Sequence, residues 1–275
     1  MLSLAKRGVH SILTYHSNRA EADKVVALVG EASARAIALQ LDTGNVDAFD
    51  DFVTRVGEAL HRLGVQRFDY LVNNAGTSHH NPFDRTTAAE LDALYNVHFK
   101  GVSFLTQKLL PLLTDGGRIV NLSSGLTRLT IPGSASYASM KGAVEVLTHY
   151  LAKQPGPRRI AVNTVAPGAF ATDFSRGMVR DNPELNGRIA ADTALGRVGV
   201  PEDIGPMIAA RLSDDDRWIN GQHRSLGRHG AVSAVTGRYR NRSERLVTGR
   251  CAVLASETPR AREDACTPSY STSPG

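Results

Sequence analysis

Cysteine is scarce in this chain of 275 residues, which contains only Cys251 and Cys266. Both lie beyond residue 250, so residues 1–222 contain no thiol. A disulfide framework and a thiolate metal site are therefore excluded for that part of the chain. The sequence predicts no metal site of any kind.

Long apolar runs are absent as well. No window approaches the roughly 18 consecutive apolar residues that a membrane helix needs. Lys6, Arg7 and His10 interrupt the first 13 residues, which also lack a small-residue cleavage site, so a secretory signal peptide is not predicted. A cytoplasmic protein with no membrane partner is the expectation.

Lysine is missing from residues 223–275, which carry nine arginines and four acidic residues. Residues 1–222 carry 23 Lys+Arg and 23 Asp+Glu, so the whole net charge of +5 comes from the C-terminal segment. The pI of 9.4 would by itself suggest a nucleic-acid partner. Because residues 1–222 are neutral, no nucleic-acid partner is predicted.

What the sequence does contain is an alternation of strand-like and helix-like apolar patterns. With 41% apolar residues, the chain can bury one substantial α/β core. The alternation is typical of a doubly wound, mostly parallel sheet between two helix layers, a Rossmann-like three-layer α/β/α architecture. Strands are predicted at residues 10–15, 35–41, 68–73, 117–122 and 160–166, and helices at 19–29, 46–63, 87–113, from about 136, and 201–213.

A serine, a tyrosine and a lysine are spaced so that they can converge. Tyr137 and Lys141 are four apart in a predicted helix and lie on one face of it. Ser124 ends an apolar strand thirteen residues before Tyr137. A neighbouring cation lowers the pKa of a phenol from its usual ~10, so Tyr137 would act as general acid or base on a carbonyl or alcohol oxygen to which Ser124 donates a hydrogen bond. The alternative is a solvated Tyr–Lys pair on a surface helix.

Two further motifs accompany this trio in order along the chain. Asn73-Asn74-Ala75-Gly76 closes one predicted strand, and Pro167-Gly168-Ala169-Phe170-Ala171-Thr172 follows another. In this combination, from about Leu4 to Gln222, the sequence resembles the short-chain dehydrogenase/reductase family. The resemblance implies an oxidoreductase of the alcohol dehydrogenase or carbonyl reductase class, which transfers hydride between a nicotinamide cofactor and a small carbonyl or alcohol substrate. Lys141 would tune Tyr137 and bind the nicotinamide ribose.

The resemblance also assigns cofactor contacts. Asp42 matches the family's adenine-contacting aspartate, although it is also placed to cap a helix before Val46. Asn73, Ala75 and Gly76 would line the adenosine side, with glycine allowing the backbone to pass close to the cofactor. Pro167, Gly168 and Thr172 would border the nicotinamide, and residues 173–193 would form a mobile substrate lid.

The choice of cofactor depends on the residues that end the strand 10–15. A carboxylate there would bind a ribose diol and repel a 2′-phosphate, whereas this chain has His16-Ser17-Asn18-Arg19. Neutral donors and a cation favour NADP(H) over NAD(H). The alternative for Arg19 is an ordinary surface residue in the first turn of a helix.

A fourth catalytic residue is ambiguous. The family's asparagine lies shortly before a Lys-Gly pair, and alignment on Lys100-Gly101 puts His98 there, with Asn96 two residues earlier. Positions i and i+2 of a helix point apart, so both cannot serve. Asn96 is the provisional candidate. His98 would either hold a proton-relay water or be an ordinary buried histidine.

Both ends of the chain depart from the family. The glycine-rich turn that holds the pyrophosphate is not found before Asn73, and residues 1–8 resemble the end of the family's first helix, so the first, central strand is expected to be missing. A translation start placed too far downstream would explain this. After Gln222, the family continues with a strand and a Gly-Gly pair, whereas this chain has an arginine-rich sequence. Our hypothesis is that a reading-frame shift produced this difference.

These departures leave two alternatives open. The predicted domains are an incomplete cofactor-binding domain at 1–222 and a basic tail at 223–275, expected to be disordered. A natural tail that binds an acidic partner is the rival to the frame shift. In the first alternative, the chain is an oxidoreductase that forms a homodimer or homotetramer through helices within 91–113 and 137–151. In the second, it is an inactive fragment that at most associates with intact relatives.

Overall fold

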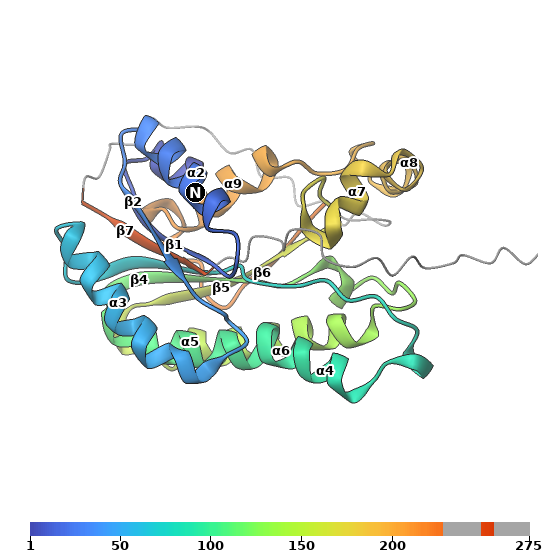
Figure 1. Cartoon of the computed structure of the whole chain (residues 1–275), viewed down its shortest axis with the longest axis horizontal. Coiled ribbons are helices and arrows are strands. Elements are labelled where there is room, and N and C mark those ends of the chain that lie inside the picture. The colour runs from blue at the N-terminus through green and yellow to red at the C-terminus, as the bar shows by residue number, and fades with distance from the viewer. Residues whose placement is uncertain (228–248, 256–275) are drawn as a thin grey trace, which may run out of the picture.

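The computed structural model describes residues 1–227 and 249–255 (Figure 1). Within these ranges, seven strands form one sheet in the order β2-β1-β7-β3-β4-β5-β6, and every neighbouring pair is parallel. The strands are β1 (His10–Tyr15), β2 (Ala36–Gln40), β3 (Phe68–Asn73), β4 (Leu113–Leu122), β5 (Ala161–Pro167), β6 (His223–Leu226) and β7 (Cys251–Ala255). The predicted doubly wound parallel sheet is confirmed.

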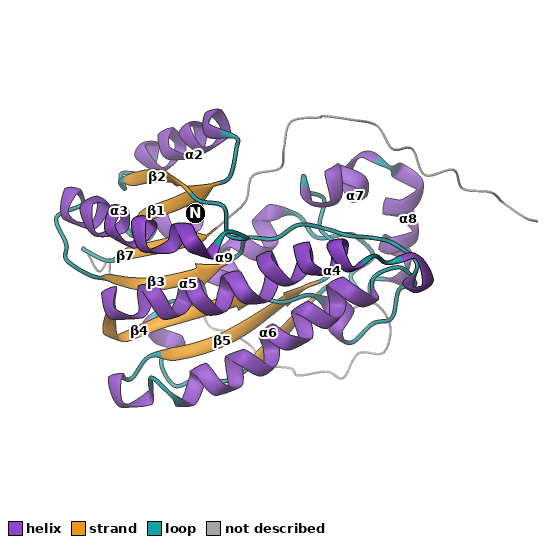
Figure 2. Ribbon diagram, turned by 60° about the horizontal axis from the view of Figure 1, so that its bottom comes forward, coloured by secondary structure: helices purple, strands orange, loops and turns teal. Residues whose placement is uncertain are grey.

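Helices cover both faces of this sheet (Figures 1 and 2). One layer contains α3 (Phe49–Arg62), α4 (Ala88–Tyr95), α5 (Gly101–Leu109) and α6 (Ala135–Lys153). The other contains α1 (Leu2–Ala5), α2 (Arg19–Glu31) and α9 (Pro201–Arg211). Two more helices, α7 (Met178–Asp181) and α8 (Pro183–Asp192), lie beyond one end of the sheet.

The core follows from the helical stripes in the sequence. The buried side chains of α3 are Phe49, Phe52, Val56, Ala59 and Leu60, at the 3- and 4-residue spacing that places them on one face. They join apolar side chains of the sheet in one cluster. On the opposite face, Leu4 of α1 and Ala209 of α9 pack over the sheet in a second cluster.

The long helix predicted at 87–113 is interrupted. After α4, residues Asn96–Lys100 form a π-helical turn (η3), and α5 begins at Gly101. A short 3₁₀ turn, Leu110–Leu112, then leads into β4. π-Turns inside helices often occur at functional sites, and this one contains both candidates for the fourth catalytic residue.

The central strand comes from the C-terminal segment. In β7, Cys251 pairs with His10 of β1, and Ala252 pairs with Tyr70 of β3. All five strand residues are buried, and Ala252 and Val253 are 0% exposed. The strand therefore provides hydrogen-bond partners to β1 and β3 at the centre of the sheet.

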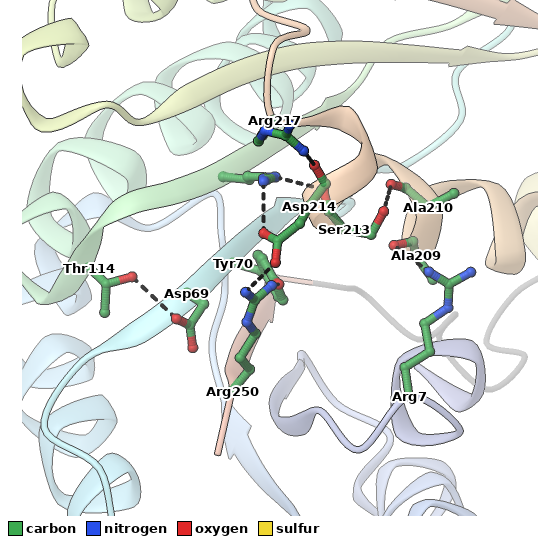
Figure 3. Close-up of polar contacts among 11 residues, drawn as sticks. Arg7, Asp69, Tyr70, Thr114, Ala209, Ala210, Ser213, Asp214, Arg217 and Arg250 are labelled. Atoms are coloured by element: carbon green, nitrogen blue, oxygen red, sulfur yellow. Dashed lines mark hydrogen bonds and ion pairs between the residues drawn. The ribbon is translucent and has the colours of Figure 1, made fainter. Parts of the chain in front are cut away.

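Side chains hold the start of β7 in place (Figure 3). The guanidinium of Arg250 donates to the Tyr70 hydroxyl and, over 2.8 Å, to Oδ2 of Asp214. Arg118 reaches the other oxygen of Asp214 at 3.2 Å. The backbone N–H of Cys251 donates to Oδ2 of Asp69 at 2.9 Å. Strands β3, β4 and β7 are thus linked by charged side chains at this end of the sheet.

Two expectations about the ends of the chain are therefore wrong. The predicted boundary at Gln222 falls inside the folded sheet, because His223–Leu226 and Cys251–Ala255 are strands rather than a disordered tail. The position of the strand expected to be missing is filled by β7, which pairs with both β1 and β3. The remainder of the predicted tail, 228–248 and 256–275, lies outside the described residues.

In the part of the chain that the structure describes, no helix combines the length and the apolar character needed to cross a membrane.

Candidate active site

The predicted trio is assembled at the carboxyl end of the sheet. Ser124 follows β4, and Tyr137 and Lys141 lie one turn apart on α6, which packs against β4 and β5. Their exposed fractions are 9%, 8% and 4%, so the alternative of a solvated surface pair is wrong. The Ser124 hydroxyl is near enough to the Tyr137 phenol to act on it and lower its pKa.

The charge state of the trio differs from the expectation. Burial raises the pKa of Tyr137 to about 12, against the opposing effect of its hydrogen bond from Ser124. The predicted lowering by Lys141 is wrong because the ammonium lies 5.8 Å from the ring centroid and donates to the Leu122 carbonyl at 2.9 Å. Burial also lowers the pKa of Lys141 to about 8.

His98 is the side chain of the π-turn that meets Tyr137. Its ring is 0% exposed and stands edge-on to the tyrosine ring, with centroids 5.1 Å apart. Burial, followed by the charge of Lys141, lowers its pKa to about 3, so the imidazole is neutral. Nε2 lies 2.9 Å from the Thr77 carbonyl and donates to it, while buried Nδ1 has no hydrogen-bond partner among the described residues.

Asn96 occupies a different position. It is half-buried at the start of the π-turn, and its Cβ would lie 3.9 Å from a Cβ placed on Gly44, in the loop after β2. The structure therefore brings His98, two residues further on, to the ring of Tyr137.

The segment after β3 serves the site mainly through its backbone. The side chain of Asn73 points into the core, where Nδ2 donates to Thr106 at 3.0 Å and to Asn121 at 2.8 Å. Ala75 is buried. A Cβ on Gly76 would lie 2.9 Å from Cε1 of His98 and 3.8 Å from Nζ of Lys141, so glycine is required here by the close approach of these side chains.

The four residues after β1 are mostly engaged locally. Asn18 caps α2 by accepting from Glu21 N, and Ser17 is exposed.

Nε of Arg19 donates to Asp23 at 2.8 Å, and its guanidinium lies 5.7 Å from the centroid of the Tyr15 ring. Nε2 of His16 lies 3.6 Å from Oδ2 of Asp42, which brings the ends of β1 and β2 together.

Asp42 does not cap the following helix. Its Oδ1 accepts from Gly44 N at 2.8 Å in a local turn, while Asn45 caps the 3₁₀ turn Val46–Ala48 by accepting from Asp47 N. The cap interpretation of Asp42 is thus wrong, and its Oδ2 faces His16.

The loop after β5 is packed tightly against β6. Gly168 N donates to Leu226 O at 2.8 Å, and a Cβ on Gly168 would lie 2.4 Å from Gly227 O, which explains the glycine after Pro167. Thr172 Oγ1 accepts from Phe174 N at 3.3 Å. The ring of Phe174 lies 6.4 Å from that of Tyr137, so the start of the predicted lid reaches the trio. The segment predicted to form the lid contains the short helices α7 and α8 and the 3₁₀ turn Phe174–Gly177.

An open pocket of about 560 Å³ is lined by residues that neighbour the trio in the sequence. Neighbours of the catalytic candidates line it, among them Leu126, Ser134 and Ala138, together with Phe83 and Ile131. Its lining is mostly apolar and does not include Ser124, Tyr137 or Lys141.

Two residues of the site were missed from the sequence. Phe174 was included only within the lid, and nothing in its local pattern distinguishes it. Glu145, whose carboxylate accepts from Ser123 at 2.6 Å and from Thr127 at 2.7 Å, was not considered. Its spacing of four residues from Lys141, on the same helix face, was the available signal.

Comparison with known proteins identifies relatives of this chain. A family model described as enoyl-(acyl carrier protein) reductase matches residues 2–226. The chain is 35% identical over 235 residues to a hydroxynaphthalene reductase-like protein of Metarhizium brunneum, covering 80% of this chain and 85% of that protein.

Two solved structures are similar in fold and sequence. A promiscuous reductase, LugOII, which catalyses keto-reduction at C1 in lugdunomycin biosynthesis, superimposes with a TM-score of 0.77 and 35% identity, covering 82% of this chain and 88% of that one. The angucycline C-6 ketoreductase LanV with bound NADP gives a TM-score of 0.75 and 30% identity, covering 81% and 88%.

Proposed function

Because the chain belongs to the short-chain dehydrogenase/reductase family, an oxidoreductase family, we propose that it is an NADPH-dependent ketoreductase. The observation that carries this proposal is the buried arrangement of Ser124, Tyr137 and Lys141 at the carboxyl end of the sheet. The inactive-fragment alternative rested on a missing central strand, and β7 occupies that position.

Lys141 fits the ribose of a nicotinamide cofactor. Lys141 is charged below pH about 8 and has three N–H donors, one of which goes to the Leu122 carbonyl, so the ammonium can bind a ribose hydroxyl. When bound, the cofactor supplies hydride to the carbonyl carbon of the substrate.

The protein's own residues bind the carbonyl oxygen and move the proton. Ser124 and Tyr137 both donate hydrogen bonds to that oxygen, and the Tyr137 phenol gives up its proton as negative charge develops there. With a pKa of about 12, Tyr137 is fully protonated at neutral pH and is therefore in the state required for reduction. Protonated Lys141 would bind the ribose of the cofactor, and the neutral Nδ1 of His98 is placed to accept a hydrogen bond from a water that returns the proton.

NADP(H) is the proposed cofactor, in preference to NAD(H). The basis is the absence of a carboxylate in the sequence His16-Ser17-Asn18-Arg19 after β1 and the exposed guanidinium of Arg19. Arg19 already forms an ion pair with Asp23, which weakens its binding of a phosphate. The preference for NADP(H) over NAD(H) is therefore expected to be modest. LanV, at 30% identity, was solved with NADP.

We further propose a ketone fused to an aromatic ring as the substrate class. The hydroxynaphthalene reductase-like protein and LanV carry names that denote aromatic or polycyclic substrates. The apolar pocket lined by sequence neighbours of the trio and the ring of Phe174 supply surfaces on which a flat ring system can pack.

The test is the oxidation of NADPH and of NADH, followed at 340 nm, with 1-tetralone as the ketone. We expect turnover with NADPH and a loss of about 10² to 10⁴-fold in kcat for Tyr137→Phe. Tyr150→Phe is the matched control, because Tyr150 is on the same helix and 65% exposed. Equal activity of Tyr137→Phe and wild type would overturn the proposal.

A homodimer or homotetramer is proposed through the helices of one face. Large apolar side chains are exposed on them: Leu91 and Tyr95 on α4, Phe104 on α5, and Val146 and Tyr150 on α6. Light scattering after size exclusion should give a multiple of 29.5 kDa for the wild type and a smaller multiple for Val146→Asp. A monomeric wild type would contradict this assembly.

A further inference from the structure

The carboxylate of Glu145, which is not part of the trio, binds the chain segments next to Ser124. Glu145 lies on α6, four residues after Lys141. Its Oε1 accepts hydrogen bonds from Ser123 Oγ at 2.6 Å, from Thr127 Oγ1 at 2.7 Å and from Nε2 of His223 at 3.0 Å. The Glu145 side chain is 16% exposed and that of His223 11%.

The bonds to Glu145 determine its charge. Burial tends to raise the pKa of this carboxyl, but the hydrogen bonds from His223, Ser123 and Thr127 outweigh it and bring the pKa to about 2. Glu145 is therefore ionised at neutral pH, and hydrogen bonds to a charged oxygen are stronger than those between neutral groups.

The donors lie on both sides of Ser124 in the chain. Ser123 immediately precedes it, and its backbone N–H is fixed to Val165 O of β5 at 2.7 Å. Thr127 ends the 3₁₀ turn that Ser124 begins, and Thr127 Oγ1 lies 3.0 Å from Ser124 O. The carboxylate thus fixes the Ser124 turn to the helix that carries Tyr137 and Lys141.

His223 adds a third segment to the cluster. It is the first residue of β6 and lies beside Thr164 of β5 in the sheet register. Its side chain reaches over to α6 and donates to the oxygen that holds the serine turn. The position of the carboxylate therefore depends on the edge strand β6 as well as on α6.

We propose that Glu145 is a positioning residue that holds Ser124 against Tyr137 and Lys141, with His223 orienting its carboxylate. Glu145 does not touch the reacting atoms and acts only through the Ser124 turn. The proposal rests on the proposed ketoreductase function, since positioning is expressed as a rate. Displacing a catalytic group by about 1 Å can cost on the order of 10²-fold in rate.

The main test compares Glu145→Gln with the wild-type protein. The amide keeps the size of the side chain but lacks the charge, so kcat for the reduction of 1-tetralone should fall at least about tenfold while the Kd for NADPH, from fluorescence titration, changes less than about twofold. Asp203→Asn is the matched control. Asp203 also accepts several hydrogen bonds, and its pKa is about 2, but it bonds to Arg197 and Val200 rather than to the serine turn.

Two further measurements separate positioning from simple loss of stability. In a Ser124→Ala background, Glu145→Gln should lower kcat by less than about twofold, because the group that it positions is already gone. His223→Gln, which keeps an N–H donor, should retain more activity than His223→Val. Equal effects of Glu145→Gln in the two backgrounds would overturn the proposal.

Backbone hydrogen exchange provides a readout that needs no substrate. Peptides covering residues 122–128 should exchange faster in Glu145→Gln than in the wild type and in Asp203→Asn. If the wild type reduces no ketone, the proposed function fails, and exchange alone decides whether Glu145 fixes the turn. Unchanged exchange in Glu145→Gln would contradict the positioning role.

Discussion

The imidazole of His98 stands edge-on to the ring of Tyr137, with centroids 5.1 Å apart and an interplanar angle of 87°. The protonated form of His98 is disfavoured for two reasons, because the ring is completely buried and because the neighbouring Lys141 already carries a positive charge. His98 is consequently a neutral group at every pH above about 3.

This neutrality predicts a pH dependence of stability. The unfolded chain binds a proton at His98 below pH about 6.5, whereas the folded chain binds it only below about 3, so the unfolding free energy falls as the pH falls between these values. The contribution between pH 7.5 and 4.5 is about 2 to 3 kcal/mol. Urea unfolding should show this loss in the wild type and not in His98→Asn. His149→Asn, at an exposed position, should behave like the wild type.

Lys141 predicts the alkaline limit of activity. Its folded pKa of about 8 means that the ammonium that would bind the cofactor ribose is lost as the pH rises through 8, and kcat/KM for NADPH should fall there. A pH profile of kcat/KM for NADPH tests this, with Lys153→Met, an exposed change on the same helix, as the control. A profile that stays level to pH 9.5 would argue against a role for the charge.

The same residue predicts a stability effect of definite sign. Between pH 8 and 10.5 the unfolded chain keeps the Lys141 proton that the folded chain has lost, so this group makes the unfolding free energy rise with pH. Relative to Lys141→Met, the wild type should gain about 2 kcal/mol between pH 8 and pH 10. No relative gain would mean that the ammonium is not desolvated.

Gly76→Ala should disturb the site directly. The added methyl would lie 2.9 Å from the ring of His98, so the ring or the backbone must move. Overpacking of this kind costs about 1 to 3 kcal/mol, and the displaced His98 should also lower kcat. Gly142→Ala provides the control, because a Cβ there has no heavy atom within 4 Å. Thermal unfolding and NADPH oxidation of the two variants give the comparison.

Val253→Asp tests whether β7 is the central strand. Val253 is 0% exposed and lies between β1 and β3, so an aspartate there would be a buried, unpaired charge. Because native proteins are stable by only ~5 to 15 kcal/mol, the variant should lose its cooperative urea transition. Leu28→Asp, at a 43% exposed position on α2, should change the midpoint little. A folded Val253→Asp would place this strand elsewhere.

The sequence was informative wherever a pattern was local. The stripe from Phe49 to Leu60 predicted α3, and the spacing of Tyr137 and Lys141 predicted a shared helix face. Strand ends at the carboxyl edge of the sheet brought Ser124 and Gly76 to the same place. These features depend on side-chain period and strand direction, which can be read from short windows.

The sequence was uninformative where a contact depends on distant segments. The pKa of Tyr137 could not be predicted because it depends on burial by the assembled fold, which outweighs the cation four residues away. Between Asn96 and His98, spacing alone gave no decision, and the π-turn determines which one faces the tyrosine. The role of residues 251–255 was missed because five apolar residues in an arginine-rich segment have no detectable partner until β1 and β3 are placed.

The position of β7 has a consequence for the order in which the protein can form. On the ribosome, β1 and β3 emerge long before the strand that lies between them, which is synthesised only after residue 250. Until then their facing edges have no partner, which is the condition that favours aggregation and chaperone binding. The pairing of His10 with Cys251 also gives the sheet a very high contact order, and such topologies fold slowly. Closure of the sheet is therefore expected to wait until β7 has emerged from the ribosome and to be the slowest step of folding.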